Sequence, residues 1–388
     1  MIKMLTAWTC ELDNPEKATQ DILDQVDIKN GLLKNTVGLL FCQYKFIDMN
    51  IVEALCKALP FDVLGATSMF FGMAGQEGEI MLTLAVLTSD DTEFATGLSE
   101  TITVENVESC LHALYEKTVS SFGGGTADLI FAFPPTLLGV PGDIITGALD
   151  RAGKGLPVFG TIAVDLDVHI RKPKTIFRGA TYSDRLPLLL FKGPVKPKFF
   201  FLRFPEKSSL AQDAVITEAK GSKIISINNK PALGFLREVG LFHDGGSGYT
   251  HAIPLVMGDS EGENLEVLVV QDITAEGTLV CGRQVAVGAV LNIGAITSNY
   301  VLESALTLIK DIKGHKGETG LFIISCFLRS LVLREGSMTE FKLIQQELGS
   351  FPIPYLYLNS GGELCPKYLE SGETENQALQ YAIVACQF

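Results

Sequence analysis

The order of predicted elements constrains the fold most, because one unit recurs about three times along the chain. Each unit reads as an apolar strand, a helix, a second strand, a Gly-rich turn and a further strand. Short apolar runs are typical of buried strands, whereas apolar residues at spacing four indicate one face of a helix. The three units begin with the apolar runs 37–42, 128–133 and 320–326.

This recurrence predicts an α/β protein with mixed sheets flanked by helices. The irregular spacing excludes a solenoid of short repeats. Internal duplication and ordinary α/β alternation both remain open as explanations. The pattern predicts helices at 48–59, 142–151 and 339–348, a helix starting at Asn14-Pro15, and continuous strands at 175–182 and 378–386.

A compositional break divides the chain into two halves. Residues 192–198 are basic and rich in proline, and a polar stretch follows at 205–212. Beyond it, Gly221-Ser222 lies between two strand-like runs, which is the pattern of a two-residue hairpin. We therefore place a domain boundary near residue 210, between residues 1–210 and 211–388.

The charge of the chain disfavours two classes of partner. The net charge is −14 and the pI is about 4.9, and an acidic protein repels phosphate backbones and anionic lipid surfaces. There is no uninterrupted run of 18 apolar residues, and the N-terminus lacks the apolar core of a signal peptide. We expect no nucleic-acid binding, no membrane insertion and a cytoplasmic location.

Known cofactor and metal motifs are absent. The eight cysteines contain no C-x-x-C pair and the five histidines no H-E-x-x-H, so neither a disulfide framework nor a metal site is predicted. Residues 147–155 depart from the P-loop pattern, the glycines at 123–125 precede a strand rather than a helix, and 245–249 fails G-x-S-x-G. No cofactor is expected.

Three polar clusters remain as candidate sites. Ser325, Cys326 and Arg329 follow a buried-looking strand, at the strand end where α/β proteins place ligands. Gly362 precedes Glu363 in a Gly-Gly turn that lets a backbone approach closely. In the third cluster, residues 243–244, a His precedes an Asp. From spacing alone, a structural explanation is favoured for all three: a buried Cys with a surface Arg, a hairpin turn with a solvated Glu, and a His and Asp that do not touch.

At these residues the chain resembles the FIST domain family, a sensory module of bacterial signal-transduction proteins that also occurs in some eukaryotic F-box proteins. Residues 61–68 and 157–165 resemble strands of its N-terminal part, and 227–232 resembles the entry to its C-terminal part. The C-terminal hallmarks correspond to Ser325, Cys326 and Arg329, then Gly349 and Pro352, then Gly362, Glu363 and Pro366, and finally Asn376. Leu328 and Thr161 depart from the glycines common in the family.

The resemblance implies a cytoplasmic protein that binds a small, amino acid-like ligand and signals to a separate protein. Under it, Arg329 would anchor an anionic group, and Glu363 would take an ammonium or orient Arg329. Ser325 and Asn376 would supply hydrogen bonds, Gly362 would let the backbone approach, and Cys326 would form a wall. Two alternatives stay open: an enzyme with Cys326 as the nucleophile, and a protein-interaction scaffold without a ligand.

Overall fold

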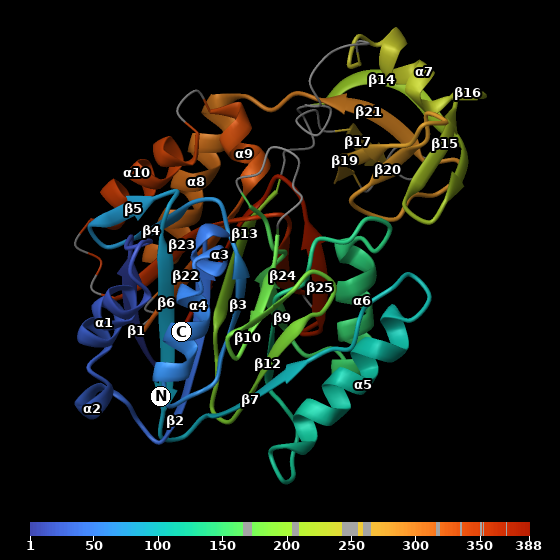
Figure 1. Ribbon diagram of the computed structural model, residues 1–388. Helices are drawn as coiled ribbons and strands as arrows, with labels where there is room; N and C mark the ends of the chain where they lie inside the picture. The colour runs from blue at the N-terminus through green and yellow to red at the C-terminus, as the bar shows by residue number, and fades with distance from the viewer. Residues whose placement is uncertain are drawn as a thin grey trace.

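Three interlocked units and an inserted lobe make up the structure. The computed structural model describes the chain except residues 166–172, 204–208, 243–254, 259–264, 316–318, 334–335, 350, 352 and 370, and it describes only the backbone of 209–213. The units form a body of three six-stranded sheets, while the described residues between 209 and 294 form the lobe, seen at the upper right of Figure 1. Within the described residues, no helix is long and apolar enough to cross a membrane.

The elements of the body repeat in nearly the same order in each unit. Unit 1 contains β1 (Lys3–Thr9), α1 (Pro15–Val26), α2 (Ile28–Gly31), β2 (Asn35–Cys42), α3 (Lys45–Asp48), α4 (Ile51–Ala58), β3 (Val63–Thr67), β4 (Phe71–Met73), β5 (Gln76–Gly78) and β6 (Leu82–Ser89). Unit 2 contains β7 (Glu93–Leu98), α5 (Val107–Ser120), β8 (Leu129–Ala132), α6 (Gly142–Gly153), β9 (Val158–Thr161), β10 (Thr175–Phe177), β11 (Ala180–Tyr182) and β12 (Pro187–Lys192).

Unit 3 is interrupted by the lobe. It contains β13 (Lys198–Leu202), α8 (Ser298–Lys313), β22 (Leu321–Cys326), α9 (Phe327–Val332), α10 (Ser337–Leu348), β23 (Tyr355–Ser360), β24 (Glu363–Tyr368), β25 (Thr374–Leu379) and β26 (Ile383–Gln387). The lobe, inserted after β13, contains β14 (Ser209–Lys220), β15 (Lys223–Ile227), β16 (Lys230–Pro231), α7 (Ala232–Glu238), β17 (Leu255–Gly258), β18 (Glu266–Leu268), β19 (Val270–Ile273), β20 (Leu279–Cys281) and β21 (Val290–Gly294).

Each body sheet is completed by a hairpin from another unit. A parallel pair lies at the centre of each sheet: β2 and β3, β8 and β9, or β22 and β23. The last strand of the same unit pairs antiparallel with the first member. The second member pairs with a hairpin from another unit. Hairpin β10–β11 of unit 2 joins the sheet of unit 1, β24–β25 of unit 3 joins that of unit 2, and β4–β5 of unit 1 joins that of unit 3. The exchange therefore closes into a cycle.

The loops that lead into these hairpins bond to one another, and we call residues 67–70, 161–165 and 359–362 the loop ring. The Val164 N–H donates to the Thr67 carbonyl (3.2 Å), and the Ser68 hydroxyl donates to the Asn359 carbonyl (2.8 Å). The Ile162 N–H donates to the Gly362 carbonyl (2.9 Å). Every pair of loops is thus linked by hydrogen bonds, which satisfies backbone groups that burial would otherwise leave unpaired.

Glycine is required at two equivalent places just before the ring. A Cβ on Gly65 would lie 1.9 Å from the Leu40 carbonyl oxygen, and one on Gly160 would lie 1.8 Å from the Ala132 carbonyl oxygen. No side chain fits at these distances, so only glycine lets the second strand of the parallel pair approach the first so closely. The same constraint in units 1 and 2 supports internal duplication of the α/β unit.

The inner faces of the three sheets share one apolar core, which contains side chains of all three units. Phe131 stands near its centre, with its ring centroid 5.2 Å from Phe159, 4.9 Å from Phe191 and 5.9 Å from both Phe322 and Phe388. The outer faces pack against helices, namely α1 and α4 in unit 1, α5 and α6 in unit 2, and α8 and α10 in unit 3. Figure 1 shows these helices around the outside of the body.

The mixed α/β class is confirmed, and several local predictions hold. Asn14 caps α1, since its side chain accepts the Lys17 N–H at 3.0 Å, and Pro15 is the first helical residue. The hairpin at Gly221-Ser222 joins β14 to β15. The body sheets combine strands from both sides of residue 210. The domain boundary near that residue therefore stays a prediction.

Two predicted continuous strands are wrong. The segment 175–182 is the hairpin β10–β11, because Arg178 and Gly179 both adopt positive φ and reverse the chain. The segment 378–386 is divided between β25 and β26, with Tyr381 at φ 55° in the turn. Non-glycine residues rarely adopt this conformation, so an apolar or mixed pattern does not reveal these turns.

The shared core makes a strong prediction for stability. Phe131→Ala removes a ring that contacts both its own sheet and that of unit 3, and such truncations cost about 3–5 kcal/mol of unfolding free energy. Leu138→Ala, at a side chain 62% exposed, should change it by less than about 0.5 kcal/mol. Urea denaturation measures both, and similar losses in the two variants would contradict the shared core.

Candidate functional site

The first candidate residues form a buried ion-pair network behind β22. Arg329 on α9 is fully buried, and its Nε and Nη2 donate to Oε1 of Glu340 on α10 at 3.0 and 2.5 Å. Nη2 also donates to the Val301 carbonyl and the Ser304 hydroxyl of α8, both at 2.9 Å. Buried charges persist when paired and hydrogen-bonded in this way.

The second oxygen of Glu340 organises the strand side of the network. Its Oε2 accepts the Ser325 hydroxyl at 2.7 Å and the Tyr357 hydroxyl at 3.1 Å. Burial, together with the negative charge of Glu340, raises the pKa of Tyr357 well above its usual range, so the phenol stays neutral and donates. One carboxylate therefore ties α9 and α10 to β22 and β23.

Arg329 and Ser325 are brought together, but their donors already have internal partners. An anchoring role for Arg329 toward a ligand would require it to exchange bonds with Glu340 or α8. Glu340 itself was not predicted from the sequence, because a Glu in the first turn of a helix is an ordinary surface residue that favours the helix dipole. Its burial arises from the packing of α10 against α8, α9 and the sheet of unit 3.

The second group of candidates is Cys326 and Glu363, and the hydrogen bond from Arg329 Nη1 to the Tyr381 carbonyl (3.4 Å) links the first network to it. Glu363 begins β24 and is fully buried, and neither carboxylate oxygen has a hydrogen-bond partner among the described residues. Burial raises the pKa of this carboxyl well above its usual range, although the positive charge of Arg329 and nearby donors such as the Ala382 N–H act against the increase. An unpaired buried carboxyl is costly and calls for a partner.

Cys326 is a buried thiol beside this carboxyl. It ends β22 with a side chain only 1% exposed, and its N–H donates to the Ala382 carbonyl at 2.9 Å. Burial, and then the neighbouring Glu363, raise the pKa of the thiol well above its usual value. The thiol therefore stays protonated at neutral pH, and a protonated thiol is a poor nucleophile.

The lobe covers this centre. Val256, Val267 and Val269 of the lobe belong to one apolar cluster with Cys326 and Tyr381 of the body. In Figure 1 the lobe stands beside the end of the body that carries α9, the helix that follows Cys326. We call Cys326 and Glu363, together with Tyr381 and this cover, the Cys326–Glu363 centre.

Gly362 lies in the loop ring next to this centre. Its N–H donates to the Ser360 hydroxyl at 3.0 Å and its carbonyl accepts the Ile162 N–H at 2.9 Å. Its predicted backbone approach is therefore made to another loop of the same chain. A small cavity of about 30 Å³ adjoins it, lined also by Gln380, Gln271 and Gly282.

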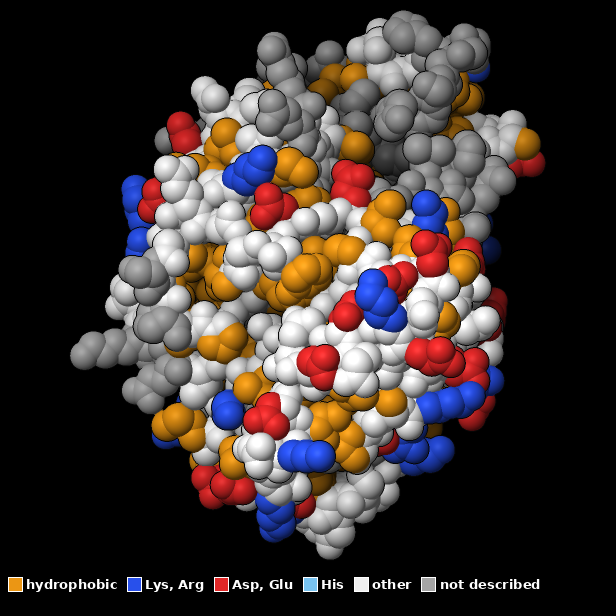
Figure 2. Space-filling view, turned by 60° about the vertical axis from the view of Figure 1, so that its left-hand side comes forward, with side chains coloured by type: hydrophobic (Ala, Val, Ile, Leu, Met, Phe, Trp, Pro, Cys, Tyr) orange, Lys and Arg blue, Asp and Glu red, His pale blue; other side chains and the backbone are white. Residues whose placement is uncertain are grey.

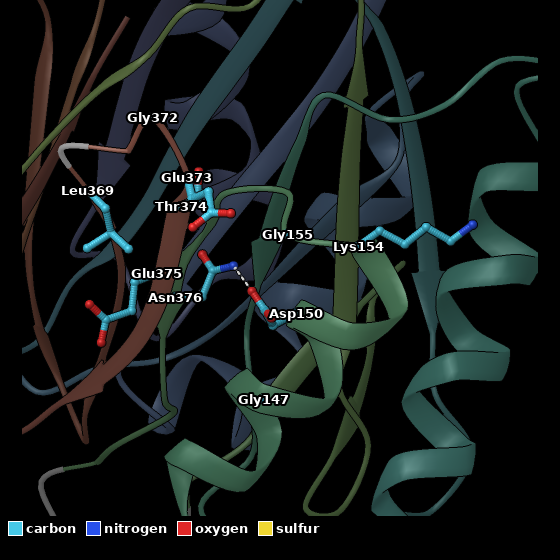
Figure 3. A pocket seen from close by; sticks show the side chains of 10 residues that line it. All are labelled: Gly147, Asp150, Lys154, Gly155, Leu369, Gly372, Glu373, Thr374, Glu375 and Asn376. Atoms are coloured by element: carbon cyan, nitrogen blue, oxygen red, sulfur yellow. Dashed lines mark hydrogen bonds between the residues drawn. The ribbon is translucent and has the colours of Figure 1, made fainter.

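Asn376 is placed away from the other candidates, on β25 and against the end of α6. Its side-chain amide donates to Asp150 Oδ1 (2.6 Å) and to the Leu156 carbonyl (2.8 Å), and its Oδ1 accepts the Val158 N–H (2.7 Å). It lines a hollow of about 610 Å³, and Figure 3 shows Lys154 pointing away from Asp150 there. These contacts explain Asn376 as a residue that joins the β24–β25 hairpin to unit 2.

Some predicted features lie outside the described residues, namely the His and Asp at 243–244 and Pro352. Within the described part of the chain, no group of three or more His, Cys, Asp or Glu side chains is placed to hold a metal ion. On the face drawn in Figure 2, acidic and basic side chains are interspersed.

The ion pair predicts a large effect of charge removal. Glu340→Gln keeps the shape but leaves Arg329 as an uncompensated buried charge, so we expect a loss of about 3–5 kcal/mol of unfolding free energy. Glu238→Gln breaks the exposed pair with Lys230 and should cost less than about 1 kcal/mol. Equal urea midpoints for the Glu340→Gln variant and the wild type would show that the network does not stabilise the fold.

The unpaired carboxyl predicts a pH dependence. Because the pKa of Glu363 is higher in the folded than in the unfolded chain, the folded state holds an extra proton above about pH 4.3, the ordinary pKa of Glu. Stability should then fall as pH rises toward the folded-state pKa, by up to about 1.4 kcal/mol per pH unit. Glu363→Gln should remove this component in urea denaturation across pH 5–8, and parallel profiles for the variant and the wild type would refute it.

The FIST N domain matches residues 36–230 and the FIST C domain matches residues 233–366. No curated protein matches the chain. Among solved structures, it is similar to a cyanuric acid hydrolase from A. caulinodans, with a TM-score of 0.37, 9% identity, and coverage of 100% of this chain and 98% of that chain.

Proposed function

The chain belongs to the FIST family of sensory, signal-transduction domains, and we propose that it senses a small, amino acid-like ligand at the Cys326–Glu363 centre. The observation that carries this proposal is the Glu363 carboxyl, which is fully buried and has no hydrogen-bond partner among the described residues. Native proteins rarely leave such a group unpaired. A ligand that supplies the missing partner would gain the interaction without any further cost of burying the carboxyl.

The chemistry of the centre favours a ligand with an ammonium group. An ammonium donates up to three hydrogen bonds and would stabilise the ionised form of Glu363. Arg329 is close enough to lower the pKa of Glu363, and a carboxylate on the same ligand would pair with Arg329 if the guanidinium exchanged one of its bonds to Glu340 or α8. Both charges together describe a free amino acid or a closely related small molecule.

The proposed output is a change in how the protein contacts a separate signalling protein in the cytoplasm. A ligand shifts a conformational equilibrium only as far as it binds one state better than another. The family assignment supports a sensory role, while the ligand, the partner and the location are parts of this proposal.

The enzyme alternative has less support. A nucleophilic Cys needs a depressed pKa or an adjacent base, whereas burial raises the pKa of Cys326. A scaffold without a ligand would leave Glu363 without the partner that its burial calls for. Cys326→Ala should therefore retain ligand binding.

A thermal-shift screen of the full chain against the common amino acids, small amines and small carboxylates tests the proposal. A ligand at 100 times its Kd stabilises the folded state by about 2.7 kcal/mol, and we expect this for at least one amino acid. Glu363→Gln should abolish the shift, whereas Glu375→Gln, an exposed Glu in the hollow of Figure 3, should preserve it. The proposal fails if no compound shifts the wild type, or if Glu363→Gln responds equally.

A further inference from the structure

The lobe is built as a separate folding layer. Its strands form one sheet in the order β18-β17-β21-β14-β15-β20-β19, with β16 beside β15. In the described part of the chain, none of these strands pairs with a strand of the body. The lobe also has its own apolar core, which includes Ile216, Leu268 and Leu291. It can therefore keep its internal contacts if it moves relative to the body.

Among the described residues, two hydrogen bonds join the lobe to the body at their seam. The Val269 N–H of the lobe donates to Oε1 of Gln380, in the turn between β25 and β26, at 2.9 Å. The Gln284 N–H of the lobe donates to Oδ2 of Asp143, in the first turn of α6, at 2.9 Å. Both acceptors are body side chains, and both donors are lobe backbone groups.

Between these two hydrogen bonds, packed side chains of the lobe and the body bury Cys326 and Glu363. Val256, Val267 and Val269 pack on Cys326 and Tyr381. The cavity at the seam measures about 30 Å³, which is room for about one water molecule. A ligand as large as an amino acid therefore cannot reach Glu363 through this seam without opening it.

We propose that the lobe is a lid, which opens at this seam to admit the ligand and is latched by Gln380 and Asp143. The body cannot supply the movement, because hairpin exchange and the loop ring bind its three units to one another. Among the described residues, no lobe strand is shared with the body, so the lobe is the element that can change position without breaking a sheet. The lid rests on the proposed ligand site, but its opening can be measured without any ligand.

The test is the rate at which N-ethylmaleimide labels individual cysteines in the native full chain, read by peptide mass spectrometry. In the wild type, Cys326 should label faster than Cys365 and Cys386, which are buried in the body core. Gln380→Ala removes one latch and should raise the Cys326 rate about 2- to 10-fold. The rates of Cys365 and Cys386 should not change.

A matched variant controls for the loss of a Gln side chain. Gln25 on α1 also accepts a backbone N–H, that of Trp8 at 3.1 Å, but lies far from the lobe in sequence and packs on β1. Gln25→Ala should leave the Cys326 rate unchanged. Asp143→Ala tests the second latch independently and provides the measurement if Gln380→Ala does not fold.

Three outcomes would overturn the lid. One is an unchanged Cys326 rate in both latch variants. Another is a common increase at Cys326, Cys365 and Cys386, which would mean that the whole chain unfolds. The third is a parallel increase at Cys281, which is buried in the lobe core and would show that the lobe unfolds rather than opens. A lid that fails while Glu363-dependent ligand binding persists would place the entry route elsewhere and leave the proposed function intact.

Discussion

The exchange of hairpins between the three units is the constraint on which the rest of the structure depends. Each sheet lacks its outer two strands until another unit supplies them, and the last donor returns to the first acceptor. A unit on its own would expose a strand edge and its part of the shared core. The loop ring forms where the three donated segments cross, and it is therefore a product of the exchange and not a separate feature.

This arrangement also fixes the position of the candidate residues. Glu363 is the first residue of a donated hairpin and pairs with Thr161 of unit 2, whereas Cys326 ends a strand of unit 3. The two side chains meet because the crossing brings β24 past the end of β22. The Arg329–Glu340 pair then holds the helices of unit 3 against the same strands.

Much of the local structure could be predicted, but the exchange could not. Apolar runs and caps identify β2, β8, β22 and α1 because these elements follow from local patterns. In contrast, β4 and β5 have three residues each. The sequence Phe71-Gly72-Met73 contains no pattern that predicts pairing with β23. Position 72 is a glycine because the Phe341 ring of α10 fills the space that a side chain there would occupy.

The candidate site shows the same division. Spacing alone favoured a structural explanation for Ser325, Cys326, Arg329 and Glu363, and only the family resemblance grouped them as site residues. Glu340 was missed because its sequence context is that of an exposed helical residue, and its burial is a tertiary effect. The resemblance linked Asn376 to the site through its sequence order, whereas the structure places it farther along the donated hairpin.

The pairing of β4 with β23 has a consequence for how the chain is made. Phe71 lies opposite Leu358 in this ladder, so the hairpin emerges from the ribosome roughly 280 residues before its partner strand. At about 5–20 residues per second, that interval is roughly 15–60 s. During it, a short apolar hairpin has no sheet to join, and contacts so distant in sequence close slowly. Folding of the body therefore waits for the C-terminal strands, and the nascent chain is the state in which this protein is most exposed to misassembly.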